Sequence, residues 1–141
     1  MPQSEEAAHW FDAVYTAIQA IPAGQVCTYG YVALLLGFPQ RARQVGVCLK
    51  HLPPYDSSDP EAHYFHGDNV PWWRVVNAKG GISPRGDGGE AVARQVERLR
   101  AEGIEVSNPR GIEEFTVDLK TYLWQPKHLP GESSSEDEEG D

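Results

Sequence analysis

The segment VPWWRVV, residues 70–76, places two adjacent tryptophans, Trp72 and Trp73, beside Arg74. An indole ring offers an apolar, polarizable surface and one N–H donor, so it can line a pocket for a ligand. It carries no thiolate, and a neighbouring base cannot activate it as a nucleophile. The two indoles therefore cannot act as nucleophiles, although they could line a binding pocket. Its pattern alone leaves open that the tryptophans simply pack in a core.

Histidine and cysteine are the other residue types that could do chemistry. His63, His66 and Cys48 match a zinc site only weakly, because their spacing is poor and further ligands are absent. Cys27 and Cys48 are too few for a disulfide framework and are expected to be free thiols. We therefore expect no metal and no cofactor.

Three helices are predicted in the N-terminal half, over residues 5–20, 29–36 and 41–49. Thr28 can cap the second helix, and Gly37 can end it. Two short helices joined by a glycine-containing turn form a helix-turn-helix candidate, although many all-helical domains contain such a pair. The side chains expected to pack from the third helix are Ala42, Val45, Val47 and Leu49.

The second half alternates loops with short regular elements. Residues 53–69 and the glycine-rich residues 79–89 are expected to be loops. Residues 90–102 predict a helix, and residues 104–106 and 115–119 predict short strands. The fold class is therefore mainly α with small β elements. The side chains expected on the exposed face of the 90–102 helix are Arg94, Glu97, Arg98 and Arg100.

The net charge of −9 would by itself oppose nucleic-acid binding, because duplex DNA repels an acidic protein. Six of the acids lie in the last ten residues, ESSSEDEEGD, which hold no base. The rest of the chain has 15 acidic and 12 basic residues, a net charge of −3. Local charge decides whether a face can meet phosphates, so a DNA-binding face is not excluded.

The 141 residues suit one domain, which we expect to span residues 1–128 with an inserted loop at 53–69. Residues 129–141 are expected to be an acidic, disordered tail. No apolar run is long enough to span a membrane, and MPQSEEAAHW lacks the pattern of a signal peptide. We therefore expect an intracellular protein that makes no membrane contact.

Three stretches together resemble the DNA-binding domain of the O6-alkylguanine-DNA alkyltransferases. They are IPAGQVCTYGYVALLLGFPQRARQVG, VPWWRVV and GGISPRGDGGEAVARQVERLRAEGI. Their order and approximate spacing also agree, and the resemblance runs from about residue 9 to residue 126. It implies a winged-helix-like, helix-turn-helix DNA-binding domain of the alkyltransferase C-terminal type.

The chain departs from the transferases where they read Pro-Cys-His-Arg. Here the sequence is Pro71-Trp72-Trp73-Arg74, so Trp72 stands at the nucleophile position. A tryptophan there marks the non-enzymatic branch, the alkyltransferase-like proteins, which usually read Pro-Trp-His-Arg. Trp73 replaces the histidine that would relay a proton. The resemblance therefore implies that the protein is not an enzyme.

The same resemblance assigns roles in DNA binding to the helix-turn-helix, which enters the minor groove in this family. Arg43 would be the finger that intercalates where a nucleotide has left the stack, and Tyr29 would help rotate that nucleotide through its 3′ phosphate. Ala42 and Gly46 would permit close approach to the DNA backbone. Arg41 would contact a phosphate or simply be exposed. An exposed helix arginine and a packed tyrosine remain the alternatives for Arg43 and Tyr29.

A second set of residues would form the pocket for the flipped base. Trp72 would line it, and Arg85 would contact the base through a cation–aromatic interaction. Arg74 would brace the pocket loop through hydrogen bonds to backbone carbonyls. Trp73 would either support the loop or contact the base. The backbone from Val70 through Pro71 to Trp72, and that of Gly86, would also meet the base.

The function implied is binding of duplex DNA that contains an O6-alkylguanine, with the damaged nucleotide flipped into the pocket without alkyl transfer. The protein would then flag the lesion for nucleotide excision repair proteins. We expect a monomer, located in the nucleus if the source is a eukaryote.

Two other classes of function remain open. A helix-turn-helix regulator without lesion specificity would prefer a DNA sequence, and it would leave Trp72 unexplained. A hydrolase or transferase would need a pairing such as His51 or His66 with Asp59 or Asp68, which only geometry can support.

Overall fold

The computed structural model describes residues 5–83, 89–108 and 115–126. Five helices and two pairs of very short strands account for most of the regular structure of these residues. The sequence predicts the first four helices, but the strand expected over residues 115–119 covers only residues 116–117, and a single helical turn follows at residues 119–122. The helices are α1 (Glu5–Gln19), α2 (Tyr29–Leu35), α3 (Ala42–Lys50), α4 (Glu90–Ala101) and the single-turn α5 (Leu119–Tyr122), with 3-10 turns η1 (Pro39–Arg41) and η2 (Trp72–Arg74). The strands are β1 (Cys27–Thr28), β2 (Val75–Val76), β3 (Val106–Ser107) and β4 (Thr116–Val117).

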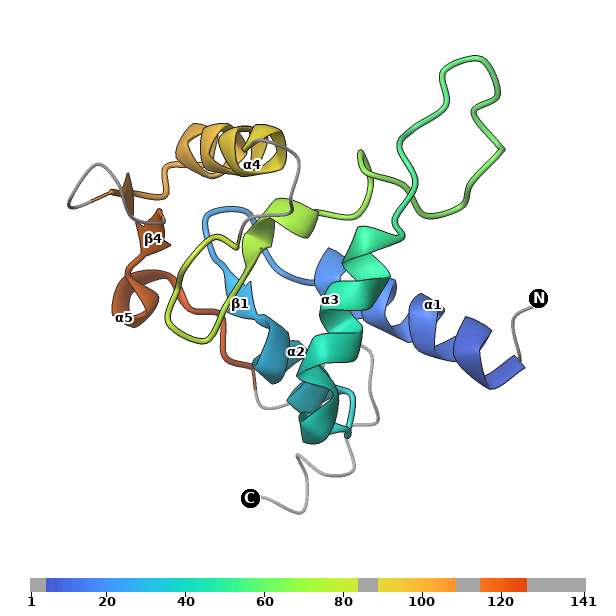
Figure 1. The fold of residues 1–141 in the computed structure, drawn as a ribbon, viewed down its shortest axis with the longest axis horizontal. Coiled ribbons are helices and arrows are strands. Elements are labelled where there is room, and N and C mark those ends of the chain that lie inside the picture. The colour runs from blue at the N-terminus through green and yellow to red at the C-terminus, as the bar shows by residue number, and fades with distance from the viewer. Residues whose placement is uncertain (1–4, 84–88, 109–114, 127–141) are drawn as a thin grey trace.

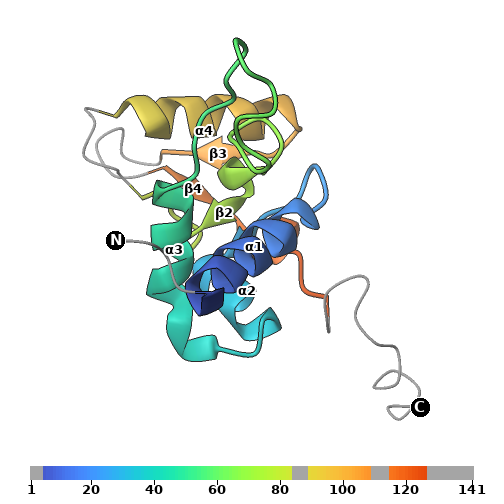
Figure 2. The ribbon, with the colours of Figure 1, turned by 90° about the vertical axis from the view of Figure 1, so that its right-hand side faces the viewer.

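The elements form three layers. α4 lies on one side of the short strands, and α1, α2 and α3 lie on the other (Figures 1 and 2). None of the helices in the described ranges is both long and apolar enough to cross a membrane. Residues 53–69 leave the end of α3 as an irregular loop that projects from the body of the molecule (Figure 1).

The predicted helix-turn-helix is α2 and α3. The Thr28 hydroxyl caps α2 by accepting a hydrogen bond of 3.0 Å from the Tyr31 N–H. Gly37 has a φ of +89°, a conformation that favours glycine, and it ends the helix before η1 leads into α3. One packing prediction was wrong. Val47 is 41% exposed, and Cys48 packs into the core in its place, because α3 turns the Val45–Cys48–Leu49 side toward α1 and α2.

The pairing of β1 with β2 links the helix-turn-helix to the tryptophan segment. These strands are parallel, with Cys27 opposite Val75 and Thr28 opposite Val76. Because α2 begins directly after β1, and η2 ends directly before β2, this pairing fixes the start of α2 relative to Trp72 and Trp73.

Two hydrophobic clusters form the core. One is built by α1, α2 and α3 with Val70 and Val75, and the other by α4 and the segments around β3 and β4 with Val76 and Trp73. Trp72 packs against both clusters. Residue 72 therefore lies at the junction of the two halves of the fold, where a ligand site is framed by several rigid elements.

Candidate nucleic-acid interface and lesion pocket

An open groove of about 810 Å³ brings together four of the residues expected to contact DNA. Tyr29 lines it from the first turn of α2, and Ala42, Arg43 and Gly46 line it from one face of α3. Lys50 adds a second cation, and none of the described lining residues is acidic, so the groove suits an anionic ligand. The remaining lining residues are Gly30, Val47, Asn77, Ala78 and Ser83.

The two arginines of the RARQVG segment have different surroundings. The Arg43 side chain is exposed and makes no hydrogen bond or ion pair within the described residues. The Arg41 guanidinium is half-buried, 4.2 Å from the centre of the Phe38 ring and 5.2 Å from that of Trp10. Arg41 is therefore not simply exposed, and only Arg43 is placed to enter the groove.

Gly46 keeps α3 close to the ring of Tyr29. A Cβ atom at residue 46 would lie 3.8 Å from Cε1 of Tyr29, which is ordinary van der Waals contact. A small side chain there would therefore not disrupt the helix, but it would occupy part of the floor of the groove.

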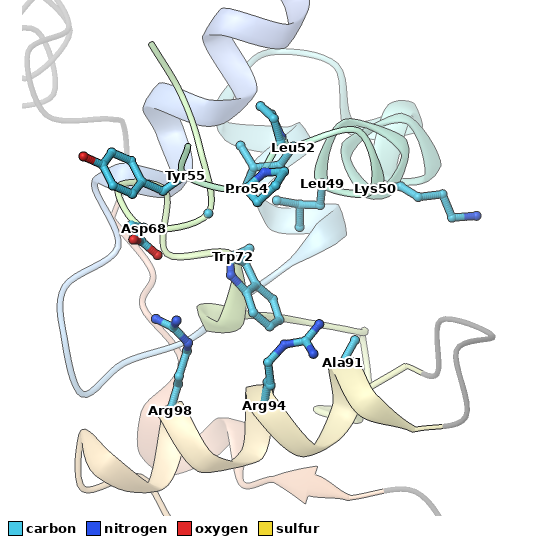
Figure 3. Close-up of a pocket in the computed structure, with 12 residues that line it drawn as sticks. Leu49, Lys50, Leu52, Pro54, Tyr55, Asp68, Trp72, Ala91, Arg94 and Arg98 are labelled. Atoms are coloured by element: carbon cyan, nitrogen blue, oxygen red, sulfur yellow. The ribbon is translucent and has the colours of Figure 1, made fainter. Parts of the chain in front are cut away.

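A second hollow of about 440 Å³ surrounds Trp72, between the end of α3, the 53–69 loop and α4. The half-buried indole forms part of its wall, and Arg94 and Arg98 point toward it from α4 (Figure 3). Lys50 lines both this pocket and the groove, so the two hollows adjoin. The other lining residues are Leu49, Leu52, Pro53, Pro54, Tyr55, Gly67, Asp68 and Ala91.

Arg74 and Trp73 both bind Glu102, which follows α4. The Arg74 Nη2 atom lies 2.5 Å from Glu102 Oε2, and the indole Nε1 of Trp73 donates to the same oxygen at 2.9 Å. Arg74 Nη1 also donates to the carbonyl of Ile21 at 2.7 Å. Within the described residues Arg74 thus reaches one backbone carbonyl, whereas a carboxylate that the sequence did not point to is its main partner.

Burial raises the pKa of the Glu102 carboxyl, but other effects outweigh it. Hydrogen bonds from Arg74, Trp73 and the Gly24 N–H, together with the charge of Arg74, hold the pKa below its ordinary value. Glu102 is therefore ionised at neutral pH and fixes the loop that carries Trp72.

Gln95 holds the same loop from the middle of α4. Its side chain is 2% exposed, and Nε2 donates to the carbonyls of Trp73 at 3.1 Å and Val75 at 3.0 Å. No sequence motif singles out Gln95, although its position four residues before Leu99 places it on the apolar side of the helix.

Trp73 supports the loop and does not line the pocket beside Trp72. It is 8% exposed, and its ring meets that of Trp72 edge to face at 5.9 Å. The guanidinium carbon of Arg98 lies 4.6 Å from the Trp73 ring centre. Arg98 was expected to be exposed, but it is half-buried because it stacks on this ring.

The two cysteines are free thiols, and both are buried in the core. Burial raises the pKa of Cys27 to about 12 and that of Cys48 to about 11, against weaker opposing hydrogen bonds. Neither supplies a thiolate at neutral pH. His66 Nδ1 accepts from the Asp68 N–H at 3.2 Å within one local turn. Within the described ranges no group of three His, Cys, Asp or Glu side chains is placed to hold a metal.

A family model for the DNA-binding domain of 6-O-methylguanine DNA methyltransferase matches residues 9–104. The chain belongs to this family. It is 40% identical over 117 residues to alkyltransferase-like protein 1 of Schizosaccharomyces pombe, a match that covers 83% of this chain and 95% of the relative. It is also 39% identical over 113 residues to a DNA base-flipping protein of Vibrio parahaemolyticus, covering 80% of this chain and 93% of the relative.

Solved structures agree with the assignment to the alkyltransferase-like branch. The crystal structure of S. pombe Atl1 in complex with damaged DNA containing O6-carboxymethylguanine superposes with a TM-score of 0.67 and 38% identity. The match covers 89% of this chain and all of that one. The expected fold, a mainly helical alkyltransferase-type DNA-binding domain with small sheets, is confirmed.

Within this alkyltransferase-like frame, Arg85 and Gly86 lie outside the described residues, as does the acidic tail. The roles of these two residues in contacting a base stay predictions. Val70 and Pro71 are buried beneath the pocket loop, with the Trp72 N–H donating to the Val70 carbonyl at 2.6 Å.

Proposed function

We propose that this protein binds duplex DNA containing an O6-alkylguanine from the minor groove and turns the damaged nucleotide into the Trp72 pocket. One observation carries the proposal: the groove that holds Tyr29, Arg43 and Gly46 adjoins the pocket of Trp72 at Lys50. The groove can follow the DNA backbone, and Arg43 can fill the space left by the flipped nucleotide. The named relatives, an alkyltransferase-like protein and a DNA base-flipping protein, support this reading.

The protein binds the lesion without removing the alkyl group. Trp72 at the nucleophile position has no thiolate, and Trp73, whose N–H is donated to Glu102, has no basic nitrogen with which to relay a proton. The buried thiols of Cys27 and Cys48 are protonated and cannot replace the missing nucleophile.

Residues 1–128 form the binding domain, and residues 129–141 form an acidic tail outside it. The protein acts as a monomer that marks the lesion for nucleotide excision repair, in the nucleus if the source is a eukaryote. Persistent binding without turnover is what a marker requires, because release by repair of the base would erase the signal.

The test is a titration against two short duplexes that differ only by one O6-methylguanine, at a fixed salt concentration. We expect the modified duplex to bind at least about tenfold tighter, a difference of about 1.4 kcal/mol. Equal affinity for the two duplexes would overturn lesion recognition, and preference for a base sequence would favour a helix-turn-helix regulator instead.

A separate assay tests the absence of chemistry. Incubation with DNA that carries a radiolabelled O6-methyl group should leave the label on the DNA. A stable labelled protein would show alkyl transfer and contradict the proposal.

A further inference from the structure

The Trp72 pocket has a cationic wall that a pocket for neutral alkyl groups does not need. Lys50, Arg94 and Arg98 line it, and Asp68 is the one acidic side chain among the described lining residues. Arg94 and Arg98 lie one helical turn apart on α4, and both point toward the indole (Figure 3). The remaining lining residues carry no charge, and Arg98 is the one half-buried cation among the three.

Arg98 is held in place by Trp73. Its guanidinium lies 4.6 Å from the centre of the Trp73 ring, and Trp73 is itself fixed by the hydrogen bond to Glu102. A guanidinium stacked on an indole face keeps its charge while losing freedom of movement. Arg94 is less constrained, because its ion pair with Glu90 is 3.6 Å long and both side chains are mostly exposed.

We infer that Trp73 is a positioning residue that fixes Arg98 beside Trp72, and that the cationic wall makes the pocket favour O6 adducts that carry a negative charge. The inference rests on the proposed function and names the class of adduct that the pocket prefers. The protein as a whole has a net charge of −9 and would otherwise disfavour an additional anion on the DNA. A preference for the anionic adduct must therefore come from the charged side chains that line the pocket.

The test uses the full chain and three duplexes of one sequence, which carry O6-methylguanine, O6-carboxymethylguanine or its amide, O6-carbamoylmethylguanine. The acid and the amide have nearly the same size, so their affinity ratio isolates charge. We expect the carboxymethyl duplex to bind at least about fivefold tighter than the carbamoylmethyl duplex at low salt. A ratio near one, with O6-methylguanine still preferred over guanine, would overturn this inference and leave the proposed function intact. Loss of preference for every adduct would overturn both.

Three pocket variants and one control test whether the cationic wall causes the acid-to-amide preference. Arg98→Gln and Arg94→Gln should each lower the acid-to-amide ratio, whereas Asp68→Asn should raise it. A structural disturbance would not move the ratio in opposite directions. Lys120→Gln removes the same charge from α5, outside the pocket, and should leave the ratio unchanged. An unchanged ratio in both arginine variants would contradict the inference.

Trp73→His tests the positioning role, because histidine is the usual family residue and can still donate to Glu102. We expect it to lose most of the acid-to-amide preference, which is a ratio of two affinities of the same variant and so does not depend on its overall affinity for DNA. Retention of the full ratio in a folded Trp73→His protein would show that Arg98 does not need the indole.

Discussion

The indole N–H of Trp73 donates to Oε2 of Glu102 across 2.9 Å, although the two residues are 29 positions apart in the chain. The same oxygen accepts from Arg74, so one carboxylate ties two consecutive residues of the pocket loop to the end of α4. Trp72 immediately precedes them. The orientation of the pocket indole therefore depends on a polar contact that lies behind it.

Glu102→Gln should lower the free energy of unfolding by about 2–3 kcal/mol at pH 7, because it leaves the Arg74 charge without its counter-ion in a mostly buried site. The lowered pKa of Glu102 sets the pH dependence. Its contribution is present above the carboxyl pKa of the unfolded chain, about 4.3, and is lost as the pH falls through the lowered folded pKa. Urea unfolding should show a smaller difference in the free energy of unfolding between the original chain and Glu102→Gln at pH 3 than at pH 7.

Glu105→Gln is the matched control for this change, because Glu105 is exposed and, among the residues the structure describes, its hydrogen bonding is confined to the backbone N–H. It should change stability by less than about 0.5 kcal/mol. If the destabilisation caused by Glu102→Gln grew as the pH fell, the ionised Glu102 carboxylate would not be the stabilising form.

Gly46→Ala should separate stability from binding. Alanine in the helix interior is favoured over glycine by up to about 1 kcal/mol, and the added Cβ meets Tyr29 at an ordinary 3.8 Å. Thermal unfolding should therefore show an equal or higher midpoint. The methyl group occupies the groove, so affinity for the lesion duplex should fall severalfold. Unchanged DNA affinity would mean that the groove does not contact the DNA backbone there.

Arg43→Ala tests the finger directly. The side chain is exposed and unpaired within the described residues, so its removal should leave stability within about 0.5 kcal/mol. Affinity for the O6-methylguanine duplex should fall at least about tenfold, with a smaller loss for unmodified DNA. Gln44→Ala, at the exposed neighbouring position that does not line the groove, is the control. An equal loss of affinity for both duplexes would indicate that Arg43 contacts a phosphate and does not intercalate at the lesion.

Removal of residues 129–141 should raise affinity for every duplex. The deletion takes six acids and changes the net charge from −9 to −3. Less repulsion from DNA should give a severalfold gain at low salt that fades as salt is added, while the ratio between modified and unmodified duplexes stays constant. A full-length chain with those six acids changed to Gln or Asn should behave like the truncation. A gain in the truncation alone would argue against a charge effect.

Local patterns predicted the elements of this fold well. Thr28, Gly37 and the apolar spacing within α2 and α3 placed the helix-turn-helix, because caps and periodicity act over a few residues. The family motif located Trp72 and Arg43, and the structure places their elements around adjoining hollows. The face that α3 turns inward was predicted less well: Val47 is exposed, because hydrophobicity alone cannot choose between neighbouring apolar positions.

The sequence by itself determined the helices, the branch of the family and the residue types available for a pocket. Only the tertiary structure decided that Glu102 and Gln95 form hydrogen bonds with the segment at residues 72–75, and that Arg98 stacks on the Trp73 ring. These contacts join residues 20 or more positions apart, and they depend on how α4 packs over the short strands. No local pattern encodes that packing. Whether a buried polar side chain stabilises the fold depends on the hydrogen-bond partner that tertiary packing places beside it, and the residue type alone does not determine that partner.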